Sequence, residues 1–199
     1  MTNNAPNTRF VSYNVGMKAN IHSSLLAIMS FLTLFGLSAT SHALDLGDAA
    51  PVPEAVDQDG RKVSFADVYA KGVTLVYFYP KADTPGCTAE ACSLRDSYAD
   101  LRASGVQVIG VSEDKPESQK KFQEKYSLPF TLIADTDATV AKAFGVSLIP
   151  IVGLASRQSF IVKDGKIAWL DRKASTNKQA EDVKAALAKL GVTIQAAKP

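Results

Sequence analysis

Two hydrophobic runs dominate the pattern of apolar and polar positions, at residues 73–79 (VTLVYFY) and 106–111 (VQVIGV). Their β-branched and aromatic residues, with little alternation, are typical of strands that are buried on both faces of a sheet. Pro80 ends the first run, and Gly105 stands directly before the second. These runs therefore predict two central strands.

Segments with helical periodicity lie before, between and after these two runs. Ser64 is expected to cap the first helix, because serine at this position can bind free backbone N–H groups. Val183, Leu187 and Leu190 lie on one face of the last helix, which marks it as amphipathic. The expected helices cover residues 65–70, 87–103, a segment that starts at Pro116 and includes Phe122 and Tyr126, 137–144 and 177–190.

Shorter strands complete the pattern. Residues 52–65 contain Asp59-Gly60 between two extended stretches, which predicts an N-terminal β-hairpin. A strand is expected at 132–134, and a second hairpin joins residues 159–162 to 167–170. Parallel strands need crossover helices, and these cover both faces of a sheet. The order of elements therefore predicts a thioredoxin-like α/β fold: a central mixed β-sheet flanked by helices, with an N-terminal β-hairpin.

The first 43 residues form a separate segment. Leu25–Leu37 is uncharged and thirteen residues long, which fits the apolar core of a secretory signal and is short for a membrane-spanning helix of about 20 residues. Lys18 precedes this stretch, and Ser41-His42-Ala43 follows it with small residues where signal peptidase reads. We expect cleavage after Ala43 and one mature domain, residues 44–199, in the periplasm or outside the cell.

Two features of this segment leave alternatives. A retained anchor facing the periplasm is the alternative to cleavage, and translation can start at Met1 or at Met17. Cleavage would leave a mature protein without stable membrane association.

Charge and histidine content narrow the function. Residues 1–43 hold two basic residues and no acidic one, so the rest of the chain carries 20 basic and 20 acidic side chains. This balance argues against a nucleic-acid-binding surface. The only histidines, His22 and His42, also lie in the N-terminal segment. A mature chain without histidine disfavours zinc or haem binding, so we expect no metal and no cofactor.

The only two cysteines, Cys87 and Cys92, lie where a loop enters the expected helix after the first central strand. Sites in open α/β sheets form outside the carboxyl ends of strands. Cys87 falls in the first helical turn, where free N–H groups and the helix dipole favour a thiolate. Gly86 is expected to let the backbone turn tightly beside the sulfur, and Thr84 offers a hydroxyl that can donate a hydrogen bond to a substrate oxygen or accept one from it.

The five-residue spacing of the cysteines has a geometric consequence. On a regular helix it corresponds to a rise of about 7.5 Å and a Cα separation of roughly 8.6 Å. A disulfide tolerates at most about 7 Å between Cα atoms. The two residues therefore cannot bond while the helix is intact. Either they form a permanent structural disulfide in a segment that is never helical, or the disulfide forms and breaks as the helix unwinds.

The segment resembles a known family. Pro80-x-x-x-Thr84-x-x-Cys87 matches the peroxiredoxin active-site motif, and the string YFYPKADTPGCTAEACSLRD is similar to the bacterioferritin comigratory protein, or peroxiredoxin Q, subfamily. Arg157 in the string RQSFIV matches the family's arginine at the start of a late strand. The resemblance extends over most of residues 45–190.

The resemblance implies a thiol-dependent peroxidase. Cys87 would be the peroxidatic cysteine and Cys92 the resolving one, with Thr84 and Arg157 as further catalytic residues. Pro80 and Gly86 would shape the substrate pocket. The implied partners are a hydroperoxide substrate and a thioredoxin-like or other dithiol reductant, and the implied assembly is a monomer. Glu90, three residues after Cys87, is expected to serve only the helix terminus.

Two other functions are weighed against this one. A thioredoxin-type thiol–disulfide oxidoreductase normally uses Cys-x-x-Cys, whereas four residues separate the cysteines here. It would exchange disulfides without consuming peroxide. A copper or other metal-delivery protein would need histidine or methionine ligands, and all three methionines lie in the N-terminal segment. Stoichiometric metal binding by the mature protein would favour this second alternative.

Overall fold

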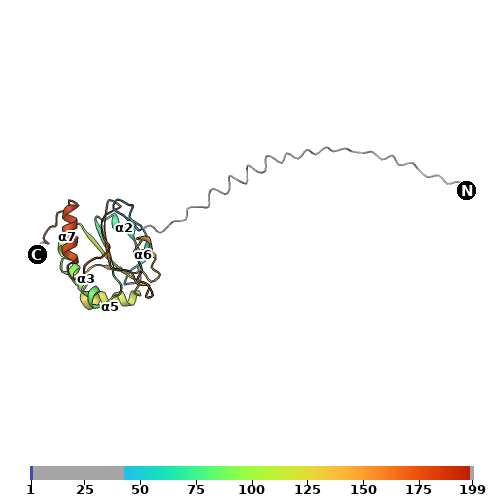
Figure 1. Cartoon of the computed structure of the whole chain (residues 1–199), viewed down its shortest axis with the longest axis horizontal. Helices are drawn as coiled ribbons and strands as arrows, with labels where there is room; N and C mark the ends of the chain where they lie inside the picture. Colours follow the sequence, from blue (N-terminus) through green and yellow to red (C-terminus); the bar gives the residue numbers. More distant parts are fainter. Residues whose placement is uncertain (2–42, 198–199) are drawn as a thin grey trace, which may run out of the picture. The chain divides into compact units, whose positions relative to one another are not determined.

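The computed structural model describes residue 1 and residues 43–197 (Figure 1). Nearly all of the expected signal segment lies outside the described residues, so its cleavage stays a prediction. No helix within residues 43–197 combines the length and the apolar character needed to cross a bilayer.

A five-stranded mixed sheet forms the centre of the domain, in the order β5-β4-β3-β6-β7. The strands β3, β4 and β5 are parallel, whereas β6 runs antiparallel to β3 and β7 antiparallel to β6. This arrangement confirms the predicted thioredoxin-like sheet. The strands are β3 (Thr74–Phe78), β4 (Gln107–Ser112), β5 (Thr131–Ala134), β6 (Gln158–Lys163) and β7 (Lys166–Asp171).

The predicted N-terminal hairpin is present as β1 (Glu54–Val56) and β2 (Lys62–Ser64), which pair antiparallel. The helix α2 (Phe65–Tyr69) follows directly. Ser64 stands at its N-cap position, but its side chain makes no capping hydrogen bond, so this prediction is wrong. Ser64 is also the last residue of β2, and its extended backbone is usual for an N-cap residue, so the position is as expected and only the side-chain bond is missing.

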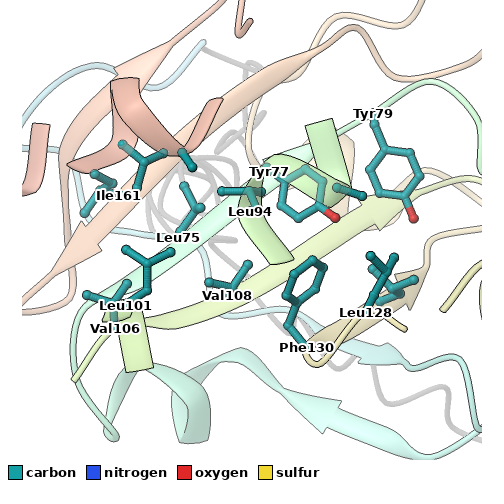
Figure 2. Packing of buried hydrophobic residues seen from close by; sticks show 14 of the residues in the cluster. Leu75, Tyr77, Tyr79, Leu94, Leu101, Val106, Val108, Leu128, Phe130 and Ile161 are labelled. Atoms are coloured by element: carbon teal, nitrogen blue, oxygen red, sulfur yellow. The ribbon is translucent and has the colours of Figure 1, made fainter. Parts of the chain in front are cut away.

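The two faces of β3 pack against different helices. Leu75, Tyr77 and Tyr79 belong to one cluster with residues of α3 (Pro85–Asp96), α5 (Pro116–Tyr126) and α7 (Gln179–Lys189). Part of this cluster is drawn in Figure 2. Val76 and Phe78 point to the opposite face, where α2 and α6 (Thr139–Ala143) pack. Every β3 residue is buried, as the uninterrupted hydrophobic run predicts.

The expected single helix over residues 87–103 is instead two helices, α3 and α4 (Tyr98–Ala103). The N–H of Ser97 donates to the carbonyl of Leu94, three residues back, so the regular helical ladder is interrupted there. Leu94 and Leu101 still reach the same core cluster, which is why apolar periodicity does not reveal the break. The helix also starts two residues earlier than expected, because proline fits the first helical position at Pro85.

Candidate active site

The site lies at the carboxyl end of β3, where a short loop leads into α3. Cys87 is the third residue of this helix and is 2% exposed. The first intrahelical bond runs from the N–H of Thr88 to the carbonyl of Thr84, at 2.8 Å. The N–H groups of Gly86 and Cys87 precede that bond and are the ones a helix leaves free for an anion. The predicted place of Cys87 in the first turn is therefore correct.

Arg157 reaches the same sulfur from a distant part of the chain. It directly precedes β6, the strand that pairs with β3, and its Nη2 lies 3.3 Å from Cys87 Sγ. Its side chain is only 18% exposed, so its charge acts in a partly desolvated setting. Residues 43–197 contain no histidine, and within this described part of the chain the guanidinium is the cation in contact with the sulfur.

Thr84 is the N-cap residue of α3, and its hydroxyl is already engaged. Its Oγ1 donates to the carbonyl of Lys81 at 2.9 Å, which leaves the oxygen lone pairs as acceptors. In this arrangement Thr84 can accept a hydrogen bond from the O–H of a hydroperoxide, and the two-way role expected from the sequence narrows to that of an acceptor. Pro80 is half-buried at the end of β3, and its part in a substrate pocket stays a prediction.

Gly86 lies close to Arg157, and its backbone conformation does not require glycine. It is absent from the glycines with positive φ, and the left-handed residue of this loop is Asp83, with φ of 57°. A Cβ on Gly86 would lie 3.4 Å from Arg157 Nη2 and 3.4 Å from Thr176 Cγ2. A methyl group would just fit at these distances, and a larger side chain would press on the guanidinium beside the sulfur. The tight turn expected from the sequence is therefore not what glycine provides here.

Cys92 is half-buried in the middle of α3, and both thiols are free. Because α3 is helical from Pro85 to Asp96, both cysteines lie on one intact helix. The geometric argument from the sequence then applies: a bond between them requires part of α3 to unwind.

Glu90 is the residue whose place was misjudged from the sequence. It is fully buried and forms an ion pair with Arg157, so it does not serve the helix terminus. Its other carboxylate oxygen has no hydrogen-bond partner among the described residues. The signal was available in the spacing, because positions three and four residues after Cys87 share its face. Ala91 at the fourth position is buried in the core, and Glu90 lies beside it.

Burial raises the pKa of Glu90 from its ordinary value near 4.5 to about 8, although the charge of Arg157 acts in the opposite direction. The folded state therefore prefers a protonated carboxyl more strongly than the unfolded state does. Its contribution to stability is complete below about pH 4.5 and is lost as the pH rises through about 8.

We therefore expect the wild type to lose stability relative to Glu90→Gln as the pH rises from 5 to 9. The relative change should be on the order of a few kcal/mol, because each pKa unit corresponds to about 1.4 kcal/mol. Urea unfolding of both proteins at pH 5, 7 and 9 measures it. A wild type that gains stability over the variant with rising pH would contradict the assigned direction.

The assembled group has a definite chemical capacity. A buried sulfur at a helix N-terminus, a guanidinium in contact with it and a hydroxyl three residues earlier can bind a substrate oxygen and stabilise negative charge on it. Within residues 43–197, no three His, Cys, Asp or Glu side chains are grouped so that they could hold a metal ion.

Comparisons with known proteins agree with this geometry. The AhpC/TSA family pattern matches residues 46–170. Peroxiredoxin Bcp of Escherichia coli K12 is 52% identical over 103 residues, which are 52% of this chain and 65% of that protein. The crystal structure of peroxidoxin BcpB from Mycobacterium tuberculosis superposes with a TM-score of 0.69 at 30% identity, covering 74% of this chain and 98% of that one.

A bacterioferritin comigratory protein structure from Xanthomonas campestris gives a TM-score of 0.65 at 26% identity, covering 73% of this chain and all of that one. The match to the E. coli relative spans just under two thirds of that relative's length. The resemblance to bacterioferritin comigratory protein inferred from the motif is confirmed. This chain belongs to the AhpC/TSA family, as the match to the family pattern, the sheet topology and the similarity to its relatives together show.

Proposed function

We propose that this protein is a thiol-dependent peroxidase that reduces hydroperoxides through Cys87. The observation that carries the proposal is the contact between Arg157 Nη2 and Cys87 Sγ at the N-terminus of α3. This arrangement places a positive charge and free N–H groups beside the sulfur in a nearly enclosed position. The E. coli relative is named a peroxiredoxin, and alkyl peroxide reduction is the activity ascribed to the X. campestris protein, which supports the same substrate class here.

In the first step the Cys87 thiolate attacks one oxygen of the hydroperoxide. The S–O bond forms as the O–O bond breaks, and the leaving oxygen takes a proton to become water or an alcohol. Arg157 and the free N–H groups of α3 stabilise the negative charge that develops on that oxygen. Thr84 accepts a hydrogen bond from the substrate and so orients it. Cys87 is left as a sulfenic acid.

In the second step Cys92 attacks the Cys87 sulfur, the hydroxyl leaves as water, and a Cys87–Cys92 disulfide forms. This step needs α3 to unwind between the two residues. An external dithiol, such as that of a thioredoxin-like protein, then returns both thiols to the reduced state and becomes a disulfide itself.

The Cys92→Ser variant tests this two-cysteine route. We expect one turnover at close to the wild-type rate, followed by arrest with Cys87 as a sulfenic acid, because the internal thiol that would expel water is missing. Rapid-mixing measurement of peroxide consumption, with mass spectrometry of the α3 peptide, follows both events. A variant that cycles normally with a dithiol reductant would show that Cys92 is not the resolving residue.

We also propose that the mature enzyme acts in the periplasm or outside the cell, after cleavage behind Ala43. The support is the uncharged stretch Leu25–Leu37 with small residues before the expected cut. The mass of the protein recovered from a secreting host tests this, since a cleaved chain begins at Leu44. Recovery of the full-length chain with the membrane fraction would favour the retained anchor.

A further inference from the structure

Both ends of α3 are tied to one place, the C-terminal end of α5. Ahead of the helix, Asp83 accepts hydrogen bonds from Lys125 Nζ at 2.8 and 2.9 Å and from Tyr126 Oη at 2.6 Å. Near the end of the helix, Arg95 Nη1 donates to the backbone carbonyl of Tyr126 at 2.9 Å. We call Asp83, Arg95, Lys125 and Tyr126 the α5 clasp.

The clasp brackets the two cysteines. Asp83 stands four residues before Cys87, and Arg95 stands three residues after Cys92. The whole segment that must unwind to form the disulfide therefore lies between the two attachment points. The first point also shapes the loop that leads into α3, since Asp83 holds a left-handed backbone with φ of 57°. Short polar side chains tolerate that conformation better than most residues do.

The contacts of Tyr126 are stronger than those of an ordinary surface ion pair. The pair between Lys125 and Asp83 is half exposed, with side-chain exposures of 57% and 46%, and alone it would contribute little. The bond from the Tyr126 hydroxyl to the carboxylate is charge-assisted and therefore stronger. The Tyr126 ring is held by Phe122, with ring centroids 5.4 Å apart, and packs against the core cluster. Because the ring is already ordered, little side-chain freedom is lost when its hydroxyl binds.

We propose that the α5 clasp restrains the unwinding of α3, with Tyr126 and Asp83 as positioning residues. For the proposed peroxidase, which this consequence presupposes, the restraint sets the fate of oxidised Cys87. Its sulfenic acid either meets Cys92 and forms a disulfide with loss of water, or reacts with a second hydroperoxide to give a sulfinic acid and an alcohol. A tighter clasp slows the first reaction and leaves more time for the second.

Tyr126→Phe is the sharpest probe, since it removes the hydroxyl and keeps the ring and the carbonyl that binds Arg95. Asp83→Asn is a milder change, because the amide oxygen can still accept from Tyr126 while the bond to Lys125 loses its charge. The matched control is Asp59→Asn, which breaks the 2.9 Å ion pair of Asp59 with Lys120, also on α5 and without an attachment to α3.

The first measurement needs no peroxide. In the reduced full chain, amide hydrogen exchange along α3 reports opening of the helix. Alkylation of Cys87 by iodoacetamide is a second and less specific readout, because this sulfur is 2% exposed but must also be reached by a hydroperoxide. We expect alkylation of Cys87 and amide hydrogen exchange of residues 88–92 to be roughly fivefold faster in Tyr126→Phe, with a smaller gain in Asp83→Asn. Hydrogen exchange in β4 of Tyr126→Phe should equal that of the wild type. The control variant Asp59→Asn should equal the wild type in both the alkylation rate and the exchange rate. Equal rates in Tyr126→Phe and wild type, or equal acceleration in the control, would overturn the proposal.

The second measurement follows the chemistry. With excess hydroperoxide, mass spectrometry should show a several-fold lower ratio of sulfinic acid to disulfide in Tyr126→Phe than in the wild type. An unchanged ratio despite faster opening would overturn the link from the clasp to the fate of Cys87. Absence of any peroxide reaction at Cys87 in the wild type would refute the proposed function, whereas the alkylation and exchange rates would still decide whether the clasp restrains α3.

Discussion

Replacing Cys87 with serine is expected to abolish hydroperoxide reduction, leaving only the uncatalysed background. A serine hydroxyl carries almost no negative charge at neutral pH, and no histidine in residues 44–199 could act as its general base. The helix N-terminus and Arg157 would remain in place but would have no thiolate to hold. The loss of activity is measured as the rate of peroxide consumption in the presence of a dithiol reductant, in rapid-mixing experiments over a range of peroxide concentrations.

A matched control is available on the same helix. Cys92→Ser makes the identical chemical change five residues later and should keep the first turnover. Both variants should show wild-type circular dichroism, since the change from sulfur to oxygen is nearly isosteric. Sustained turnover by the Cys87→Ser protein would move the peroxidatic role to Cys92 and refute the proposed mechanism.

Arg157→Ala is expected to slow the reaction of Cys87 with hydroperoxide by roughly 10²- to 10³-fold, the range found when a group that stabilises a developing oxyanion is removed. The contact of Arg157 Nη2 with Cys87 Sγ provides the physical reason, since the same guanidinium is within reach of the oxygens that the sulfur attacks. The second-order rate constant of the peroxide step, measured in single turnovers, is the appropriate readout.

The buried Glu90 makes a control necessary for this variant. Removing Arg157 leaves the Glu90 carboxyl without its partner, which costs stability on its own account. The double variant Arg157→Ala, Glu90→Gln removes the ionisable carboxyl and should recover part of the lost stability at high pH, where that carboxyl would be charged, without recovering the rate. A double variant that regains both would make Arg157 a structural residue only.

Much of the fold could be predicted from local patterns. The runs at residues 73–79 and 106–111 lie at the centre of the sheet because a strand covered on both faces must be apolar throughout. The break at Ser97 could not be predicted, since both helices present their apolar residues to one core. Periodicity reports which side of a helix is buried, and it does not reveal a break in the hydrogen-bond ladder that keeps that side buried.

Some residues of the site could be placed from the sequence, and others could not. Cys87 and Thr84 lie within four residues of each other, so a strand, a loop and a helix start were enough to place them. Glu90 was missed because a charged residue is seldom fully buried without a partner, and its partner Arg157 lies 67 residues away. Resemblance to a family marked Arg157, but nothing local to that residue showed that it would contact both the carboxylate and the sulfur.

By itself, the sequence determined the helix terminus that holds Cys87 and the spacing that keeps Cys87 and Cys92 apart on an intact helix. Both follow from the dimensions of the backbone, which depend only on neighbouring residues. The tertiary structure alone decided what surrounds that helix. Pairing of β6 with β3 brings Arg157 to the sulfur, and packing of α5 brings Tyr126 to Asp83. These contacts join residues more than 40 positions apart, and no local propensity encodes them.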